Sequence, residues 1–274
     1  MPLFTIDPKK CRHDGICVAE CPRGIIEMKP GEIPTPSASA EALCTLCGHC
    51  VAVCPYGALT HTKLPSEEFA PILPEQTLTF GQGEQFLRAR RSIRAYKDKP
   101  VDRNALENLI GAARYAPTGT NSQLVSWKVI ASRAGVKKLG NVAIDMMRDM
   151  AANNHPLAVR YQFGAMATNW DAGIDGLTRG APALVIAHAP KEYGLAQVDC
   201  TSALAYFDLM APTLGLGTCW GGFLMIAAAV WPPFQTALAL PEGHASFGIM
   251  MAGYPKYRYR LLPPRKKPEI IWTE

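Results

Sequence analysis

The stretch that decides the fold reads CTLCGHCVAVCP and runs from Cys44 to Pro55. Its four cysteines are separated by two, two and three residues, and a proline follows the last of them. Three thiolates at this spacing fit around one iron–sulfur cube, whereas the longer final gap directs the fourth thiolate to a different cluster. Zinc sites usually separate two such cysteine pairs by a dozen or more residues. The stretch therefore indicates an iron–sulfur centre rather than zinc.

The same spacing occurs earlier, in residues 11–22, with one exception. Cys11, Cys17 and Cys21 match three of the later cysteines, but Asp14 takes the place of the second one. Its carboxylate either binds the fourth iron through oxygen or leaves a three-iron cluster behind. A solvated turn residue that touches no metal would look the same. The sequence leaves these alternatives open.

The cysteines also divide the chain, because seven of the nine lie in the first 54 of its 274 residues. We expect an amino-terminal module at residues 1–62, a proline-rich linker at 63–83 and a second domain at 84–274. Seven is an odd number, and the first residues have no apolar run typical of a secretory signal. We therefore expect reduced thiols in a cytoplasmic protein.

Composition excludes several classes of protein. Apolar residues make up 48% of the chain and charged residues 19%, so global disorder is excluded. The net charge of +5 suits a phosphate-bearing ligand but is too diffuse to indicate nucleic-acid binding. Residues 209–241 contain no charged side chain, but glycine and proline interrupt this run repeatedly. We expect a buried helix, a loop and a second buried helix there rather than a membrane span.

Residues 1–62 resemble a bacterial two-cluster ferredoxin through their two cysteine motifs. In that family each motif gives one ligand to the other motif's cluster. The resemblance implies one [4Fe–4S] cluster held by Cys21, Cys44, Cys47 and Cys50. It implies a second cluster, [3Fe–4S] or an Asp-ligated [4Fe–4S], at Cys11, Asp14, Cys17 and Cys54.

From residue 84 onward the hydrophobic pattern becomes helical. Asp102 is predicted to cap a helix that ends before Pro117. Two further helices are predicted, near residues 135–152 and 198–214. Short apolar runs predict three buried strands, at residues 127–131, 183–187 and 247–252. The pattern indicates an α+β fold with a mostly buried central sheet.

A basic segment, Arg-Arg-Ser-Ile-Arg, occupies residues 90–94. Three guanidinium groups and a hydroxyl within five residues suit a phosphate and the polar groups beside it. Three later features accompany this segment: the sequence APTGTNSQ at 116–123, the pair Gly221-Gly222, and the basic group at 265–267. Together they strengthen the prediction of a phosphate-bearing ligand.

In that order and at those distances, these features resemble the FMN-dependent nitroreductase family over residues 84–274. The resemblance implies a mostly antiparallel central sheet surrounded by helices, and a homodimer with FMN at the subunit interface. It assigns the phosphate, ribityl chain and pyrimidine edge of FMN to Arg90, Arg91, Ser92, Arg94, Arg265 and Lys267. The residues implied to lie against the isoalloxazine ring are Gly221 and Gly222. Those implied to approach the flavin bound mainly by the partner subunit are Pro117, Thr118, Gly119 and Asn121.

Two departures bear on the electron donor. Gly221 stands where members of that family often have glutamate, so the position of a nicotinamide cannot be carried over. No Gly-x-Gly-x-x-Gly follows a predicted strand, so a Rossmann NAD(P) site is not expected.

Cys200 and Cys219 lie in apolar segments without a neighbouring His or Lys, and we expect inert thiols there.

The two domains together predict an iron–sulfur flavoprotein oxidoreductase whose chemistry takes place on the flavin rather than on a catalytic side chain. Clusters carry single electrons and closed-shell organic acceptors take two, while flavin converts between these modes. We expect electrons to pass from the clusters to FMN and on to a small organic acceptor, with an external ferredoxin or NAD(P)H as donor and no nucleic-acid or membrane partner. Two alternatives stay open. One is an NAD(P)H-dependent nitroreductase whose ferredoxin domain is structural or regulatory, and the other is a non-enzymatic carrier to a protein partner.

Overall fold

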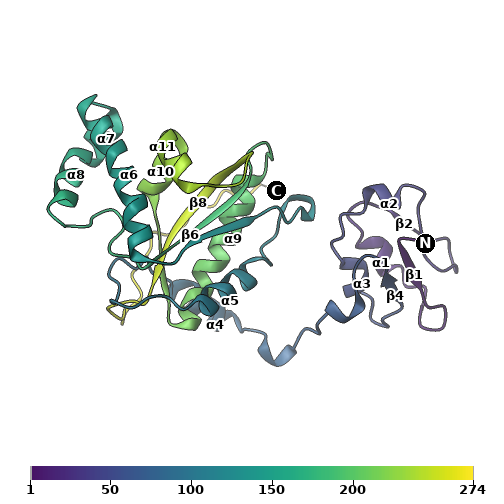
Figure 1. Cartoon of the computed structure of the whole chain (residues 1–274). Coiled ribbons are helices and arrows are strands. Elements are labelled where there is room, and N and C mark those ends of the chain that lie inside the picture. Colours follow the sequence, from purple (N-terminus) through teal and green to yellow (C-terminus); the bar gives the residue numbers. More distant parts are fainter. Residues whose placement is uncertain (1, 274) are drawn as a thin grey trace. The chain divides into compact units, whose positions relative to one another are not determined.

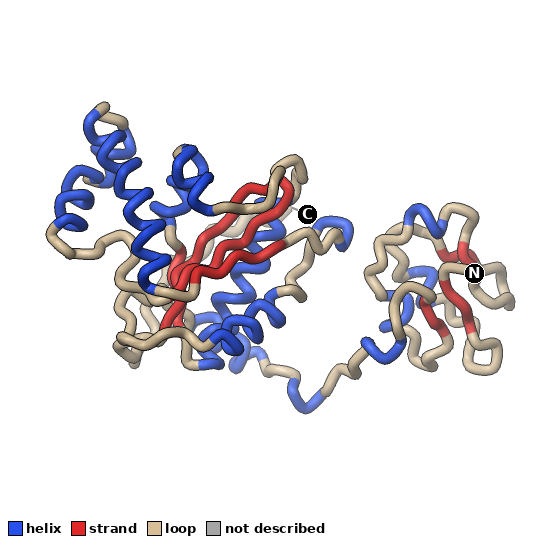
Figure 2. The backbone as a smooth tube through the Cα atoms, in the orientation of Figure 1, coloured by secondary structure: helices blue, strands red, loops and turns tan. Residues whose placement is uncertain are grey.

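A computed structural model describes residues 2–273, and the chain in it forms two compact units. Of the described residues, one unit comprises 2–77 together with 119–122, and the other comprises 78–118 together with 123–273. Figure 1 labels the helices and strands, and Figure 2 separates them by colour from the loops.

The first unit is built from short elements around a small apolar core. In chain order these are β1 Phe4–Ile6, α1 Ile16–Ala19, β2 Ile26–Glu27, β3 Thr35–Pro36, α2 Ala40–Leu43, α3 His49–Ala52 and β4 Leu59–His61. β1 pairs with β4 and β2 with β3, both antiparallel. The core consists of Leu3, Phe4, Ile25, Ile26, Ala40 and Leu59. Because this core is so small, the ligands of any bound cluster add substantially to what holds the unit together.

The two cysteine motifs of this unit have matching backbones. Gly15 and Gly48 stand at the starts of α1 and α3 with left-handed φ values of 70° and 73°. The residue two positions before each glycine is also left-handed, at 57° and 53°. Asp14 and Cys47 therefore occupy equivalent places in equivalent loops. The two loops differ in the chemistry of this side chain rather than in the path of the chain.

Residues 63–79, between the first unit's last strand and the first long helix, form only two 3-10 turns, at Ser66–Glu68 and Pro74–Gln76. α4 begins at Phe80, inside the segment predicted as a linker. The Thr79 hydroxyl accepts a hydrogen bond from the backbone N–H of Gln82, and the Gln82 side chain accepts one from the N–H of Thr79. This capping box fixes the start of the helix.

The second unit is a four-stranded antiparallel sheet with helices on both faces (Figures 1 and 2). The strands are β5 Ser126–Ile130, β6 Ala183–Pro190, β7 Gly217–Trp220 and β8 His244–Gly253, in the order β5-β6-β8-β7. The helices are α4 Phe80–Ala89, α5 Arg103–Ala113, α6 Arg133–Ala152, α7 Pro156–Tyr161, α8 Phe163–Asp171, α9 Ala196–Met210, α10 Gly222–Val230 and α11 Pro232–Leu238. This arrangement confirms the predicted α+β fold with a mostly antiparallel central sheet.

Two apolar layers join the helices to this sheet. Successive residues of β6 point to opposite faces, so Val185 enters one layer and Ile186 the other. The first layer, under α5 and α9, includes Leu106, Leu109, Leu204, Phe207 and Met250. The second, under α6, α10 and α11, includes Ile144, Met147, Leu224, Phe234 and Ile249. Burial on both faces explains why β6 reads as a continuous apolar run.

The predicted elements of this unit correspond to observed ones with one correction. Asp102 caps α5 by accepting a hydrogen bond from the N–H of Asn104 at 3.1 Å, as expected. The charge-free run at 209–241 contains β7 and two helices after the end of α9, instead of a helix, a loop and a helix. β7 forms because it pairs with β8, where Cys219 lies opposite Met251. Among residues 2–273, no helix is both long enough and apolar enough to cross a membrane.

Candidate functional site

The cysteines of the first unit line two separate cavities. The first is lined by Cys21, Cys44, Cys47 and Cys50, among apolar residues that include Leu3, Phe4, Ile25 and Ile26. The second is lined by Cys11, Asp14, Cys17 and Cys54, among apolar residues that include Ile6, Ile16 and Leu59. Each cavity takes three side chains from one motif and a cysteine from the other. The same grouping is what the ferredoxin resemblance implies for two clusters.

One thiol in each cavity, Cys50 in the first and Cys17 in the second, resists ionisation. Burial raises the pKa of Cys50 to about 11, and the negative charges of the neighbouring cysteines add to the effect. Burial also raises the pKa of Cys17, with Cys54 and Asp14 contributing. Thiolate is the form that binds metal, and the positive charge of iron offsets both effects. The donor set of each cavity therefore suits a multi-iron cluster.

The carboxylate of Asp14 is partly engaged in its own loop. Its Oδ1 accepts a hydrogen bond from the backbone N–H of Ile16 at 3.2 Å. This bond favours the turn geometry that Gly48 and Cys47 provide in the other motif. The second carboxylate oxygen is then the candidate iron ligand at this corner of the cavity.

We expect Asp14→Cys to stabilise the second cluster against loss of iron, because iron in such clusters prefers thiolate to carboxylate. In air the wild-type protein should lose about one iron per chain from this cluster, and the variant should keep it. Iron and sulfide counts with electron paramagnetic resonance (EPR) before and after exposure measure the difference.

Asp7→Cys is the matched control for this substitution. The Asp7 carboxylate also accepts a hydrogen bond from the backbone N–H two residues later, at 2.9 Å, but it lines neither cavity. This control should lose iron as the wild type does. Equal iron loss from Asp14→Cys and wild type would contradict the prediction.

The second unit contains an open cavity of about 340 Å³ beside the end of β7. Three of the residues predicted to bind flavin line it: Arg94, Gly221 and Gly222. Much of the remaining wall is apolar or aromatic, with Tyr161, Leu177, Trp220, Phe223, Ile226 and Met251. The volume and the mixture of apolar surface with a few polar groups are typical of small-molecule sites.

The two glycines shape the cavity wall in different ways. A Cβ on Gly222 would meet no atom within 4 Å, so the backbone there faces open space. A Cβ on Gly221 would stand 3.2 Å from Leu224. The N–H of Gly221 donates to the carbonyl of Ile249 at 2.8 Å and is used by the sheet. Gly222 begins α10, where backbone N–H groups have no partner within the helix, and it is the better donor toward a ligand.

Arg179 also lines the cavity, although no sequence motif identified it. Its backbone is left-handed with φ of 57°, and Gly180 follows with φ of 64°. The Asp175 carboxylate holds this loop by accepting hydrogen bonds from the N–H groups of Leu177 (3.0 Å), Thr178 (2.6 Å) and Gly180 (2.7 Å). The sequence signal that was available is the charged residue Arg179 followed by Gly180, shortly before a buried apolar run.

The two arginines favour negative charge in this cavity. Burial raises the pKa of Cys219, while Arg94, a hydrogen bond from Ser92 and Arg179 act in the opposite direction. Cys219 is buried, as expected, but it forms part of the cavity wall. Two guanidinium groups beside an apolar wall with an open glycine suit a flat ligand that carries negative charge.

The other predicted arginines lie around this cavity or beyond it. Arg90 pairs with Asp208, with 3.4 Å between Nη1 and Oδ2. Ser92 forms an isolated bridge with Thr218 of β7. The Nε of Arg91 is one of three buried side-chain nitrogen or oxygen atoms in residues 2–273 that have no hydrogen-bond partner. Two predicted basic residues are exposed in the chain after β8: Arg265 and Lys267.

The predicted segment Pro117–Asn121 does not line this cavity. Thr120 and Asn121 both have left-handed backbones, with φ of 51° and 55°. Residues 119–122 group with the first unit, and there the Asn121 amide donates to the carbonyls of Thr45 (3.0 Å) and Leu46 (3.1 Å). A role of this segment toward a partner's flavin stays a prediction.

Asp208 is a buried acid that sequence reasoning did not select. It is the last charged residue before the charge-free run, and an isolated carboxylate in an apolar helix was the available signal. Its carboxylate is bound by the Thr218 hydroxyl and by Arg90. Burial nevertheless raises its pKa, because these two partners only partly offset the loss of water.

We expect Asp208→Asn to change how the stability of the second unit depends on pH. The folded pKa lies above the unfolded value of about 3.9, so stability is full below that value and falls as pH rises through the folded pKa. Asparagine does not ionise, so the free energy of unfolding of the variant relative to wild type should increase from about pH 4 upward. Urea unfolding followed by tryptophan fluorescence measures this, because all five tryptophans lie at residue 127 or later. A pH-independent difference would contradict it.

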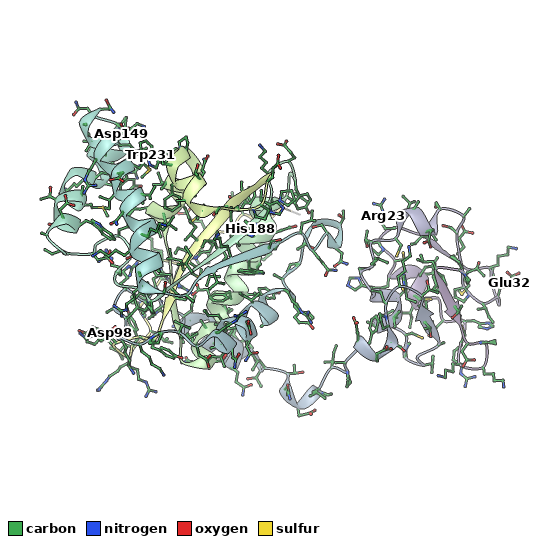
Figure 3. All side chains as sticks on the ribbon, in the orientation of Figure 1. Arg23, Glu32, Asp98, Asp149, His188 and Trp231 are labelled. Atoms are coloured by element: carbon green, nitrogen blue, oxygen red, sulfur yellow. The ribbon has the colours of Figure 1, made fainter. Side chains whose placement is uncertain are left out.

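A histidine pair lies at another place in the sheet. His188, labelled in Figure 3, stands near the end of β6, and its Nδ1 is 2.9 Å from Nδ1 of His244. Burial lowers the pKa of His188, and the charges of His244 and Lys128 lower it further. Neither histidine lines the cavity beside β7, so the pair is not part of this site.

Comparisons with known proteins agree with both halves of this description. A family model described as a 4Fe-4S dicluster domain matches residues 9–58, and the nitroreductase family model matches residues 87–254. A putative NADH dehydrogenase/NAD(P)H nitroreductase of Archaeoglobus fulgidus is 27% identical over 177 residues, which cover 61% of this chain and 82% of that protein. A similarly described protein of Methanothermobacter thermautotrophicus is 25% identical over 173 residues, covering 62% and 75%.

Solved structures show the same fold. A nitroreductase of Bacteroides fragilis with bound FMN superposes with a TM-score of 0.56 at 23% identity, covering 69% of this chain and 97% of that one. A nitroreductase of Desulfitobacterium hafniense with bound FMN gives a TM-score of 0.55 at 22% identity, covering 70% and 97%. The family match spans more than half of the 274 residues. The chain therefore belongs to the nitroreductase family, as an oxidoreductase that also carries a 4Fe-4S dicluster domain.

Proposed function

We propose that this protein is an iron–sulfur flavoprotein oxidoreductase that passes electrons from two clusters to FMN and on to a small organic acceptor. One observation carries the proposal: a single chain contains two cysteine-lined cavities and a cavity lined by two arginines and a glycine pair. The two cysteine-lined cavities suit iron–sulfur clusters, and the third cavity suits a flavin. No catalytic side chain is needed, because the chemistry belongs to the flavin.

The clusters would be held in the crossed arrangement that the cavities suggest. Cys21, Cys44, Cys47 and Cys50 would bind a [4Fe–4S] cluster. Cys11, Cys17 and Cys54 would bind the second, as [3Fe–4S] or as [4Fe–4S] with Asp14. We expect about seven or eight irons per chain.

FMN fits the cavity beside β7 on two observations, and the residues implied by the nitroreductase resemblance that do not line it, Arg91 among them, stay predictions. Arg94 and Arg179 supply positive charge for its phosphate or pyrimidine edge. The backbone at Gly222 leaves open space for a ring. Arg90, Ser92, Arg265 and Lys267 remain further candidate ligands. Bound FMN would accept electrons singly and deliver them in pairs with protons, which the clusters cannot do.

The proposed assembly is a homodimer in which Pro117, Thr118, Gly119 and Asn121 approach the partner's flavin. Sedimentation of the FMN-loaded protein tests this, with a mass of about twice the 29.7 kDa chain expected. The proposed setting is the cytoplasm, where the cluster ligands stay reduced.

A second candidate differs in the electron donor. The relatives from Archaeoglobus and Methanothermobacter are described as putative NADH dehydrogenases/NAD(P)H nitroreductases, which favours direct reduction by a nicotinamide. In that case the clusters would be structural or regulatory. Rapid bleaching of the flavin by NADH or NADPH alone, at the same rate with and without clusters, would support this candidate.

Electron transfer between the cofactors is the central test. The holoprotein is photoreduced anaerobically, and cluster absorbance and flavin absorbance are followed together. Re-oxidation of the clusters in step with bleaching of the flavin is expected. Protein that lacks clusters but retains FMN should accept electrons from the same donor much more slowly, and an equal rate would refute the proposal.

A further inference from the structure

His61 is a buried side chain in direct contact with a cysteine of the first cavity. It ends β4 and is 4% exposed. Its Nε2 lies 3.6 Å from Sγ of Cys44, within hydrogen-bond distance for sulfur. Both side chains line the cavity shared with Cys21, Cys47 and Cys50.

The hydrogen bonds of His61 determine which ring nitrogen carries the proton. The backbone N–H of Lys63 donates to Nδ1 of His61 at 3.1 Å, and a backbone N–H acts only as a donor. Nδ1 is therefore the acceptor nitrogen. The proton of the neutral ring lies on Nε2, and the Nε2–H group donates to Cys44 Sγ.

The internal repeat of this unit places a different residue at the equivalent position. His61 follows Cys54 by seven residues, and Met28 follows Cys21 by seven residues. Met28 lies against its own loop, with its Cε 3.2 Å from the position of a Cβ on Gly15. A thioether has no N–H group, so this half of the repeat offers no donor there.

We propose that His61 donates a hydrogen bond to the Cys44 sulfur and raises the reduction potential of the cluster held by Cys21, Cys44, Cys47 and Cys50. The inference rests on the proposed clusters. Reduction adds negative charge to a cluster and its thiolates, and a donor to a thiolate sulfur stabilises that charge. His61 binds no iron and acts through Cys44, so its role is that of a positioning and tuning residue.

The effect should be confined to one cluster. A hydrogen bond to a charged group is among the stronger ones, so its loss should change the equilibrium of this cluster measurably. His61→Met makes the two halves alike at this position. We expect it to lower the ratio of reduced to oxidised first cluster at least about tenfold at a fixed potential. The second cluster should titrate as in the wild type.

The experiment is a redox titration of the holoprotein with EPR detection of each cluster. His61→Gln is the rescue variant, because its amide retains an N–H donor and should recover part of the shift. His49→Met is the matched control. His49 lines the same cavity, but its side chain is 59% exposed and its Nδ1 lies 3.9 Å from Glu20 instead of on a cysteine sulfur, so a much smaller shift than that of His61→Met is expected.

Two results separate failure of this inference from failure of the proposed function. Absence of iron and sulfide from the wild-type protein would overturn the proposed clusters and, with them, the proposed function. If His61→Met contains the normal amount of both clusters and their reduction potentials are unchanged, the inference is overturned and the proposed function is not affected. If His61→Met loses its cluster, the inference is tested instead on wild-type protein whose histidine rings are labelled with ¹⁵N. Magnetic coupling of a histidine nitrogen to the reduced first cluster is expected, and its absence would overturn the inference.

Discussion

Cys50→Ser is expected to remove the first cluster and to stop electron flow to the flavin. Cys50 lines the cavity with Cys21, Cys44 and Cys47, in surroundings that already raise its pKa to about 11. A serine hydroxyl ionises far less readily than a thiol and is a poor ligand for iron in a thiolate site. The missing corner also leaves three neighbouring thiolates without the charge of iron to balance them.

The measurement combines metal analysis with kinetics. Iron per chain should fall by about four, and the flavin of the photoreduced variant should bleach only as fast as the free photoreductant allows. Cys200→Ser is the control, because Cys200 is fully buried in the core of the second unit, where it lines none of the three cavities described above. Unchanged flavin reduction in Cys50→Ser would mean that the first cluster is not on the path.

Arg94→Gln and Arg179→Gln are each expected to weaken FMN binding by about 10- to 100-fold. Each removes a guanidinium group from the cavity beside β7, and a hydrogen bond to a charged group contributes about 1.5–3 kcal/mol. Quenching of FMN fluorescence by flavin-free protein gives the dissociation constants. Riboflavin provides the second comparison: an arginine that holds the phosphate should leave riboflavin affinity unchanged.

Arg133→Gln is the matched control for both substitutions. Arg133 pairs with Asp98, which is labelled in Figure 3, and lines a different cavity that borders the other side of the Asp175 loop. Its removal should leave FMN affinity within about twofold of the wild type, as is usual for exposed ion pairs. Arg94→Gln and Arg179→Gln proteins that bind FMN as tightly as this control would show that the cavity is not the flavin site.

Much of the fold was predictable because the deciding signals are local. The cysteine spacing identifies the repeat, and the ferredoxin resemblance that it carries implies the same two groups of residues that line the two cavities. Asp102 predicts the start of α5 through a hydrogen bond only two residues long. β6 is a continuous apolar run because both of its faces are covered, and length and flanking turns were enough to identify it as a strand.

What sequence reasoning missed depends on contacts that form only in the folded chain. β7 is four residues long, and only its pairing with β8 makes it a strand. Arg179 enters the cavity because Asp175 organises the loop around it. His61 and Cys44 are 17 residues apart and meet because β4 returns beside the first strand. No spacing rule brings such pairs together before the chain is folded.

The exchange of one cysteine between the two cavities makes the halves of the first unit interdependent. If each copy of a repeated motif held its own cluster, loss of one copy would leave the other cluster intact. Here Cys21 of the first motif lines the cavity formed mainly by the second motif, at residues 44–50. Cys54 of the second motif lines the cavity formed mainly by the first motif, at residues 11–17. Loss of either copy would therefore remove lining cysteines from both cavities, so neither cavity is complete without both motifs. Asp14 and His61 stand where the other copy has Cys47 and Met28, so the two cavities differ in their electronic surroundings within one shared backbone frame.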